Sequence, residues 1–186
     1  MKFARLLIQR LPNAQHIWKV FAVIVTLVYS WTLFTSFYKL PSWMFYLTIS
    51  QIMSIYAYSF SVNLAESILA LMGVMFLEFT LFFALRGDRE GFQSRSILVI
   101  LVVLISSMLR LVLYKTYEDV GAFLSGELMW WAVTISLGLL IAVFAPKIIW
   151  VRKILDGIAE RATVFLYIYL PLSLISLIVV IARNIL

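Results

Sequence analysis

Three charged side chains that lie inside long apolar runs have the clearest potential for chemistry. Glu66, Glu78 and Arg110 each stand in a stretch dominated by aliphatic, aromatic and small residues. An ionisable group inside a membrane is energetically costly, so such groups commonly mark ion or proton paths, polar binding sites or interhelical ion pairs. We therefore take these three residues as the intramembrane polar candidates of the chain.

Helical rise predicts where these candidates lie relative to the charged stretch at 86–95. A rise of ~1.5 Å per residue puts Glu78 ~12 Å, Arg110 ~22 Å and Glu66 ~30 Å from the nearer end of this charged stretch. Arg110 should thus lie at a depth between the two carboxylates and could pair with either. An ion or proton path, or a site for a polar headgroup, is one interpretation. The other is an ion pair that fixes packing, or an arginine that extends to the interface.

The side chains that most often bind metals are nearly absent. The chain has no Cys and one His, His16, whereas zinc and haem sites are built mainly from these residues. We also find no nucleophile–base pair, phosphate-binding loop or metal-ligand spacing. We therefore expect no catalytic residues, no metal and no cofactor. An enzyme would need chemistry from Glu and Arg alone, or residues supplied by a partner.

The composition indicates what surrounds these residues. Hydrophobic residues make up 64% of the chain and charged residues 13%, against about 45–50% and about 25% in soluble proteins. Lipid must therefore solvate much of the surface. The net charge of +6 does not indicate nucleic-acid binding, because the basic residues flank apolar runs as in membrane proteins.

The apolar runs predict an all-α, polytopic membrane helical bundle in a single domain. The run from Trp43 to Leu85 is about twice the ~20 residues needed for one crossing. We divide it near residues 61–63, and we expect a tight turn at 39–42. This gives six transmembrane helices, with five as the alternative if residues 43–61 do not cross. The expected spans are 20–38, 43–61, 64–85, 96–114, 127–145 and 164–182.

Two further segments combine apolar residues at helical spacing with basic ones and predict short amphipathic helices at the membrane surface. They are residues 1–11, with Arg5 and Arg10, and residues 147–162. The second would either lie in the interface or continue the fifth helix. Their cations are expected to dock anionic lipid or a protein partner. In the second segment these cations are Lys147, Arg152, Lys153 and Arg161.

The distribution of basic residues also predicts an orientation in a cell membrane. The loops at 86–95 and 146–163 are basic, whereas the loop at 115–126 carries two acids and one Lys. The positive-inside rule therefore places the two basic loops in the cytoplasm. Six crossings would leave the basic N-terminus outside, and five would bring it inside.

Part of the chain, residues 68–145, resembles the phosphate-starvation-inducible PsiE family of small membrane proteins. The likeness rests on Phe76-Leu77-Glu78-Phe79 late in one helix, a basic loop ending at Arg95, and Arg110-Leu111-Val112-Leu113 late in the next helix. The spacing from Arg95 to Arg110 is longer than expected, and the first two helices and the last have no counterpart. The resemblance implies that Glu78, Arg95 and Arg110 are the residues of interest, without implying an activity.

These features together favour a non-catalytic membrane subunit, acting as a scaffold or accessory component of a larger complex. Its expected partners are lipids and other membrane subunits or copies of itself. The alternative is a small homo-oligomeric channel or transporter that uses Glu66, Glu78 and Arg110.

Overall fold

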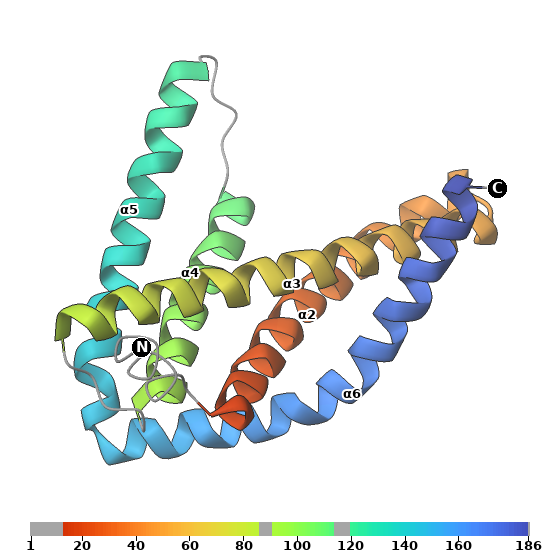
Figure 1. Ribbon diagram of the computed structural model, residues 1–186. Helices are drawn as coiled ribbons and strands as arrows, with labels where there is room; N and C mark the ends of the chain where they lie inside the picture. Colours follow the sequence, from red (N-terminus) through yellow and green to blue (C-terminus); the bar gives the residue numbers. More distant parts are fainter. Residues whose placement is uncertain (1–12, 86–90, 114–119, 186) are drawn as a thin grey trace. The chain divides into compact units, whose positions relative to one another are not determined.

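The computed structural model describes residues 13–85, 91–113 and 120–185, and the side chains of 13–80, 91–113 and 124–185. These residues form helices and short turns, with no strand among them (Figure 1). The prediction of an all-α fold is therefore confirmed. The helices are α2 (Ala14–Tyr46), α3 (Ile49–Leu85), α4 (Phe92–Leu113), α5 (Val120–Phe144) and α6 (Ile149–Ile185), with a short 3-10 turn, η2 (Ala145–Lys147).

Five helices in the described ranges are long and apolar enough to cross a membrane. The sequence analysis expected six spans, with five as the alternative. The two counts differ at α3, which is one continuous helix of 37 residues (Figure 1). Its rise of ~1.5 Å per residue gives a length of about 55 Å, well beyond the ~30 Å thickness of a bilayer core.

The break expected near residues 61–63 does not occur, because the polar residues there pack inside the helix bundle. Asn63 is 4% exposed, and its Oδ1 accepts a hydrogen bond of 3.1 Å from the Thr32 hydroxyl. Ser67 donates to the Asn63 carbonyl at 2.7 Å. Side chains that resemble a loop in sequence therefore serve as interhelical and local contacts in the middle of α3.

The turn expected at residues 39–42 is also absent, and the chain turns instead between α2 and α3, at Leu47 and Thr48. Pro41 lies inside α2. Thr48 and Gln51 form a capping box that starts α3. The Thr48 N–H donates to Gln51 Oε1 at 2.8 Å, and the Gln51 N–H donates to Thr48 Oγ1 at 3.4 Å.

The amphipathic segment at 147–162 begins the last helix and does not continue the fifth. Helix α5 ends at Phe144, η2 follows, and Ile148 adopts an extended conformation before α6 begins at Ile149. Helix α6 then runs without interruption through the expected span at 164–182 and includes Pro171. The other amphipathic segment, residues 1–11 with Arg5 and Arg10, lies outside the described residues.

The chain divides into two compact units. The first contains Val74–Gly157 and the described residues of Met1–Ile17. Here α4 and α5 pack as a hairpin, and Gly138 of α5 faces Val99 and Val102 of α4. A Cβ at Gly138 would make ordinary van der Waals contacts there, 3.6 Å from Val102 Cγ1 and 3.8 Å from Val99 Cα. Ser106 and Thr134 share a hydrogen bond of 3.0 Å across the same contact. Small and hydroxyl residues are typical of helix packing in lipid.

The second unit contains Trp18–Gly73 and Ile158–Leu186, that is, most of α2 with parts of α3 and α6. Tyr29 is fully buried at its centre. Its ring stacks on Phe60 and Tyr169, with centroids 5.5 and 4.8 Å away. Its hydroxyl bonds to the Phe60 carbonyl at 3.0 Å and to the Ser173 hydroxyl. One aromatic side chain thus connects three helices and has its polar end satisfied.

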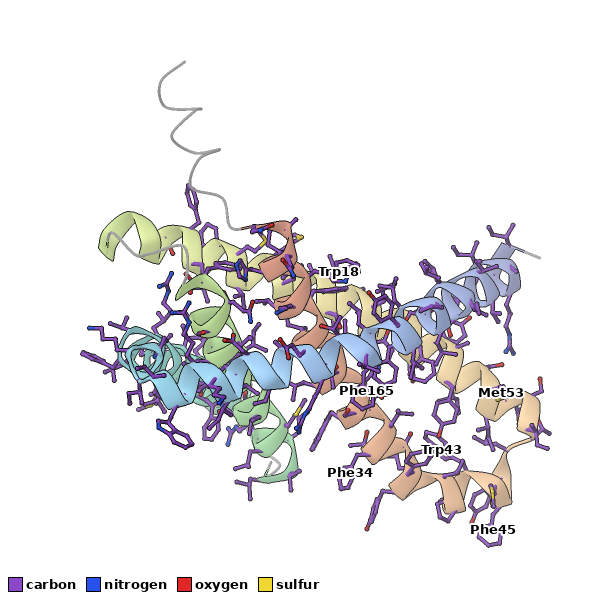
Figure 2. All side chains as sticks on the ribbon, turned by 90° about the horizontal axis from the view of Figure 1, so that it is seen from below. Trp18, Phe34, Trp43, Phe45, Met53 and Phe165 are labelled. Carbon is purple, nitrogen blue, oxygen red and sulfur yellow. The ribbon has the colours of Figure 1, made fainter. Side chains whose placement is uncertain are left out.

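Large apolar side chains cover the outside of this second unit. Phe34, Phe45 and Met53 project away from their helices in Figure 2, and they are 68%, 84% and 64% exposed. Exposed side chains of this size would be unfavourable in water but suit contact with lipid chains.

Candidate functional site: charge pairs at the ends of α4

Glu78 and Arg95 form a buried ion pair between α3 and α4. Arg95 Nη2 lies 3.3 Å from Glu78 Oε2, and Arg95 Nε lies 3.3 and 3.4 Å from the two carboxylate oxygens. The side chains are 6% exposed for Glu78 and 18% for Arg95. The guanidinium also passes close to Gly91, where a Cβ would overlap with Arg95 Nη1. Glycine at position 91 therefore leaves room for Arg95 to reach the carboxylate.

Arg110 and Glu127 form a second ion pair, between α4 and α5. Arg110 Nη2 lies 3.0 Å from Glu127 Oε1, and Arg110 Nε donates to the same oxygen at 3.1 Å. The guanidinium also lies over the Trp130 ring, 5.1 Å from its centroid. Glu127 and Trp130, three residues apart on one face of α5, thus hold the arginine from two directions.

The two pairs lie near opposite ends of α4. Arg95 is three residues after the first residue of the helix and Arg110 three residues before the last. Their separation of fifteen positions corresponds to ~22 Å along the helix axis. Within the first unit, Arg110 therefore does not pair with Glu78, one of the two partners considered from the sequence. Arg95 pairs with Glu78, and Arg110 pairs with Glu127 on the following helix.

Gln93 makes a third polar connection in the same unit. Asp156 Oδ1 accepts a hydrogen bond of 2.9 Å from Gln93 Nε2. Gln93 Oε1 lies 2.7 Å from His16 Nδ1, and this oxygen can only accept, so His16 donates from Nδ1. Gln93 is 4% exposed and thereby joins the first turn of α2 to α6 through α4. His16, the single histidine of the sequence, therefore has a defined structural contact.

Glu66, the third candidate, belongs to the second unit and has a different environment. It lies near the middle of α3, is exposed, and has no ion-pair or hydrogen-bond partner among the described residues. The sequence thus identified two groups that pair inside the chain and one that does not. Within the first unit, Glu78 and Arg110 do not contact each other, because each pairs with a different side chain.

The candidate docking cations of the last amphipathic segment lie on the surface. Lys147, Arg152, Lys153 and Arg161 are all exposed. Leu155, Ala159 and Ala162 of the same segment are at most 4% exposed, whereas the apolar side chains of Ile148, Ile154 and Ile158 are 55%, 59% and 38% exposed. The docking of these cations to lipid or a partner therefore stays a prediction.

Paired charges of this kind orient helices and do not form a continuous polar path. In the first unit, about four turns of α4 dominated by aliphatic residues separate the two pairs. Within the described residues, no group of three or more His, Asp or Glu side chains could hold a metal ion. The geometry of this unit is thus suited to holding helices in register.

Comparisons of the chain with family models, with curated proteins and with solved structures find no match. The resemblance to the PsiE family accordingly stays a prediction. The pairing of Glu78 with Arg95 joins two of the three residues that this resemblance marked.

Several structurally important residues were missed from the sequence. Glu127 marked only the start of the expected span at 127–145, Gln93 lay in the expected loop at 86–95, and Tyr29 was not singled out. One sequence signal could have found Glu127. In both ion pairs the partners are 17 residues apart, the separation of residues that face each other across a short turn between antiparallel helices.

Proposed function

We propose that this protein is a non-catalytic membrane subunit, a scaffold or accessory component of a larger membrane complex. The observation that supports the proposal best is the separate pairing of Glu78 with Arg95 and of Arg110 with Glu127. Both arginines of α4 are used to hold neighbouring helices. An interhelical pair at each end of a helix is a structural arrangement, and it leaves the apolar outer faces for contacts with lipid and other chains.

The alternative, a channel or transporter that uses Glu66, Glu78 and Arg110, gains no support from this pairing. A conducting path needs polar groups that follow one another across the membrane. Glu78 and Arg110 belong to different pairs separated by ~22 Å of helix. Glu66 is about twelve residues from Glu78 on α3, or ~18 Å.

We also propose an orientation for the chain. Five crossings with the basic stretches at 86–95 and 146–163 in the cytoplasm would place the basic N-terminus on the same side, in agreement with the positive-inside rule. Lys147, Arg152 and Lys153, all exposed, would then face the anionic inner leaflet, where each cation contributes about 1 kcal/mol to binding.

The test is purification of the tagged chain from its native membrane in mild detergent, followed by native mass spectrometry. We expect other membrane proteins to be present in a fixed, stoichiometric ratio.

The subunit proposal would be contradicted if the chain purified without other proteins and conducted ions or protons after reconstitution into liposomes. Flux that is lost in both the Glu78→Gln and the Arg110→Gln variants, with folding intact, would replace the subunit proposal with the transporter.

A further inference from the structure

Helix α6 is longer than one membrane crossing requires. Its 37 residues give a length of about 55 Å, against ~30 Å for the hydrocarbon core of a bilayer. Its charged residues are not spread along this length, because five lie between residues 152 and 161 and none lies between residues 162 and 182. The apolar stretch is long enough to cross by itself, which leaves the charged first turns for the membrane surface.

The first two turns of α6, which belong to the first compact unit, have three distinct sides. At ~100° per residue, Trp150 and Ile154 share one side, and they are 78% and 59% exposed. Leu155 marks a second side and is buried. Arg152 and Lys153, both exposed, lie on a third side between the other two. A helix that lies in a membrane surface beside its own protein needs these three sides, for the protein, for acyl chains and for headgroups.

The turn before α6 adds a cation beside an exposed aromatic ring. Lys147 is exposed, and its Nζ lies 5.4 Å from the centroid of the Phe144 ring. Residues 144–157 contain three cations and one acid, a net charge of +2. The acid, Asp156, accepts a hydrogen bond from Gln93. Exposed apolar side chains next to excess positive charge match the chemistry of an anionic phospholipid, which has both acyl chains and a phosphate.

We propose that residues 147–154 form a binding surface for anionic phospholipid, with Trp150 and Ile154 among the acyl chains and Lys147 and Lys153 at the phosphates. The inference rests on the orientation proposed above, which places this stretch on the side of the anionic leaflet. It does not depend on other subunits, because the purified chain alone should select anionic lipid. The accessory role and the lipid surface can therefore fail separately.

The first test measures the lipid selectivity of the purified full chain in phosphatidylcholine vesicles. Spin-labelled phosphatidylglycerol and phosphatidylcholine are compared by the motionally restricted fraction of their electron paramagnetic resonance spectra. We expect phosphatidylglycerol to be preferred. The preference should fall by up to about fivefold for each of the substitutions Lys147→Gln and Lys153→Gln, the effect of one cation near an anionic surface. Lys39→Gln removes an exposed lysine of α2, outside this surface, and is the matched control.

The second test measures depth at two adjacent positions, and the absence of cysteine from the sequence makes it direct. Nitroxide labels are attached to the single-cysteine variants Lys153→Cys and Ile154→Cys in the same vesicles. Oxygen concentrates among acyl chains, whereas a charged nickel chelate stays in water. We expect the label at position 154 to collide mainly with oxygen and the label at position 153 mainly with the nickel chelate.

Three results would overturn the proposal. One is an equal preference for the two lipids. Another is a preference for phosphatidylglycerol that is unchanged when both Lys147 and Lys153 are replaced by Gln. The third is a photoreactive benzoylphenylalanine in place of Trp150 that joins, in native membranes, to another protein and not to lipid.

Discussion

Each arginine of α4 has a carboxylate partner on a neighbouring helix, and this arrangement gives residue-level predictions. Replacing Glu127 by Gln removes the negative charge that faces Arg110 and leaves the arginine with Trp130 and an amide. We expect a loss of roughly 1–3 kcal/mol in the free energy of unfolding, measured by denaturant titration in mixed micelles. Glu66→Gln is the matched control, because Glu66 has no such partner among the side chains that the structure describes, and it should change stability by less than about 0.5 kcal/mol.

Tyr29 gives a second prediction at this scale. The Tyr29→Phe variant keeps the stacking on Phe60 and Tyr169 but loses the hydrogen bonds to the Phe60 carbonyl and to Ser173. Side-chain hydrogen bonds between membrane helices contribute about 0.6 kcal/mol on average and up to about 1.7 kcal/mol, so we expect a loss in that range. Tyr167→Phe, an exposed tyrosine on α6, should leave the same titration unchanged. A fully stable Tyr29→Phe variant would show that packing alone holds this core.

The connection through Gln93 gives a prediction about whole elements. Leucine at position 93 cannot bond to His16 or Asp156, so the first turns of α2 and α6 lose a common attachment. We expect faster amide hydrogen exchange at residues 14–17 and 149–157 in Gln93→Leu, with the exchange of residues 97–106 in α4 unchanged. If amide exchange in these two segments were the same in Gln93→Leu as in the unaltered chain, this role for Gln93 would be contradicted.

The helical class and the positions of the last three connections were predictable from apolar runs, because lipid imposes a strict requirement on helix length and composition. The continuity of α3 through residues 61–63 was not predicted. Ser61, Asn63 and Ser67 resemble a polar break, yet Asn63 bonds to Thr32 on another helix, and such tertiary contacts cannot be read from local sequence.

The start of α3 could have been found. Thr48 and Gln51 have the spacing of a capping box, which indicates a helix start more specifically than the preceding Pro41 indicates an end. The candidate residues, by contrast, could be found from the sequence only without their partners. Glu66, Glu78 and Arg110 were recognisable by their cost in lipid, but their partners depend on how α3, α4 and α5 face one another.

For the whole molecule, an odd number of crossings gives a prediction about topology. The two ends of the chain should lie on opposite sides of the membrane if the five helices each cross once. Single cysteines at Gln15 and Asn184, in a chain that has none, should react with an impermeant maleimide from opposite faces of sealed vesicles. Cysteine at Ser61 should stay protected from both sides, because no loop interrupts α3 there. Reaction of both ends from one face would support six crossings.

The most direct test of the central claim, that the charges inside these helices hold the bundle together, is a double-mutant cycle on Glu78 and Arg95. The variants are Glu78→Arg, Arg95→Glu and the exchanged pair, and the measurement is the free energy of unfolding in mixed micelles. Each single variant leaves two like charges in a buried position and should lose about 3–5 kcal/mol, whereas the exchanged pair should recover most of that loss. Single variants as stable as the original chain, or losses that simply add in the exchanged pair, would contradict the claim.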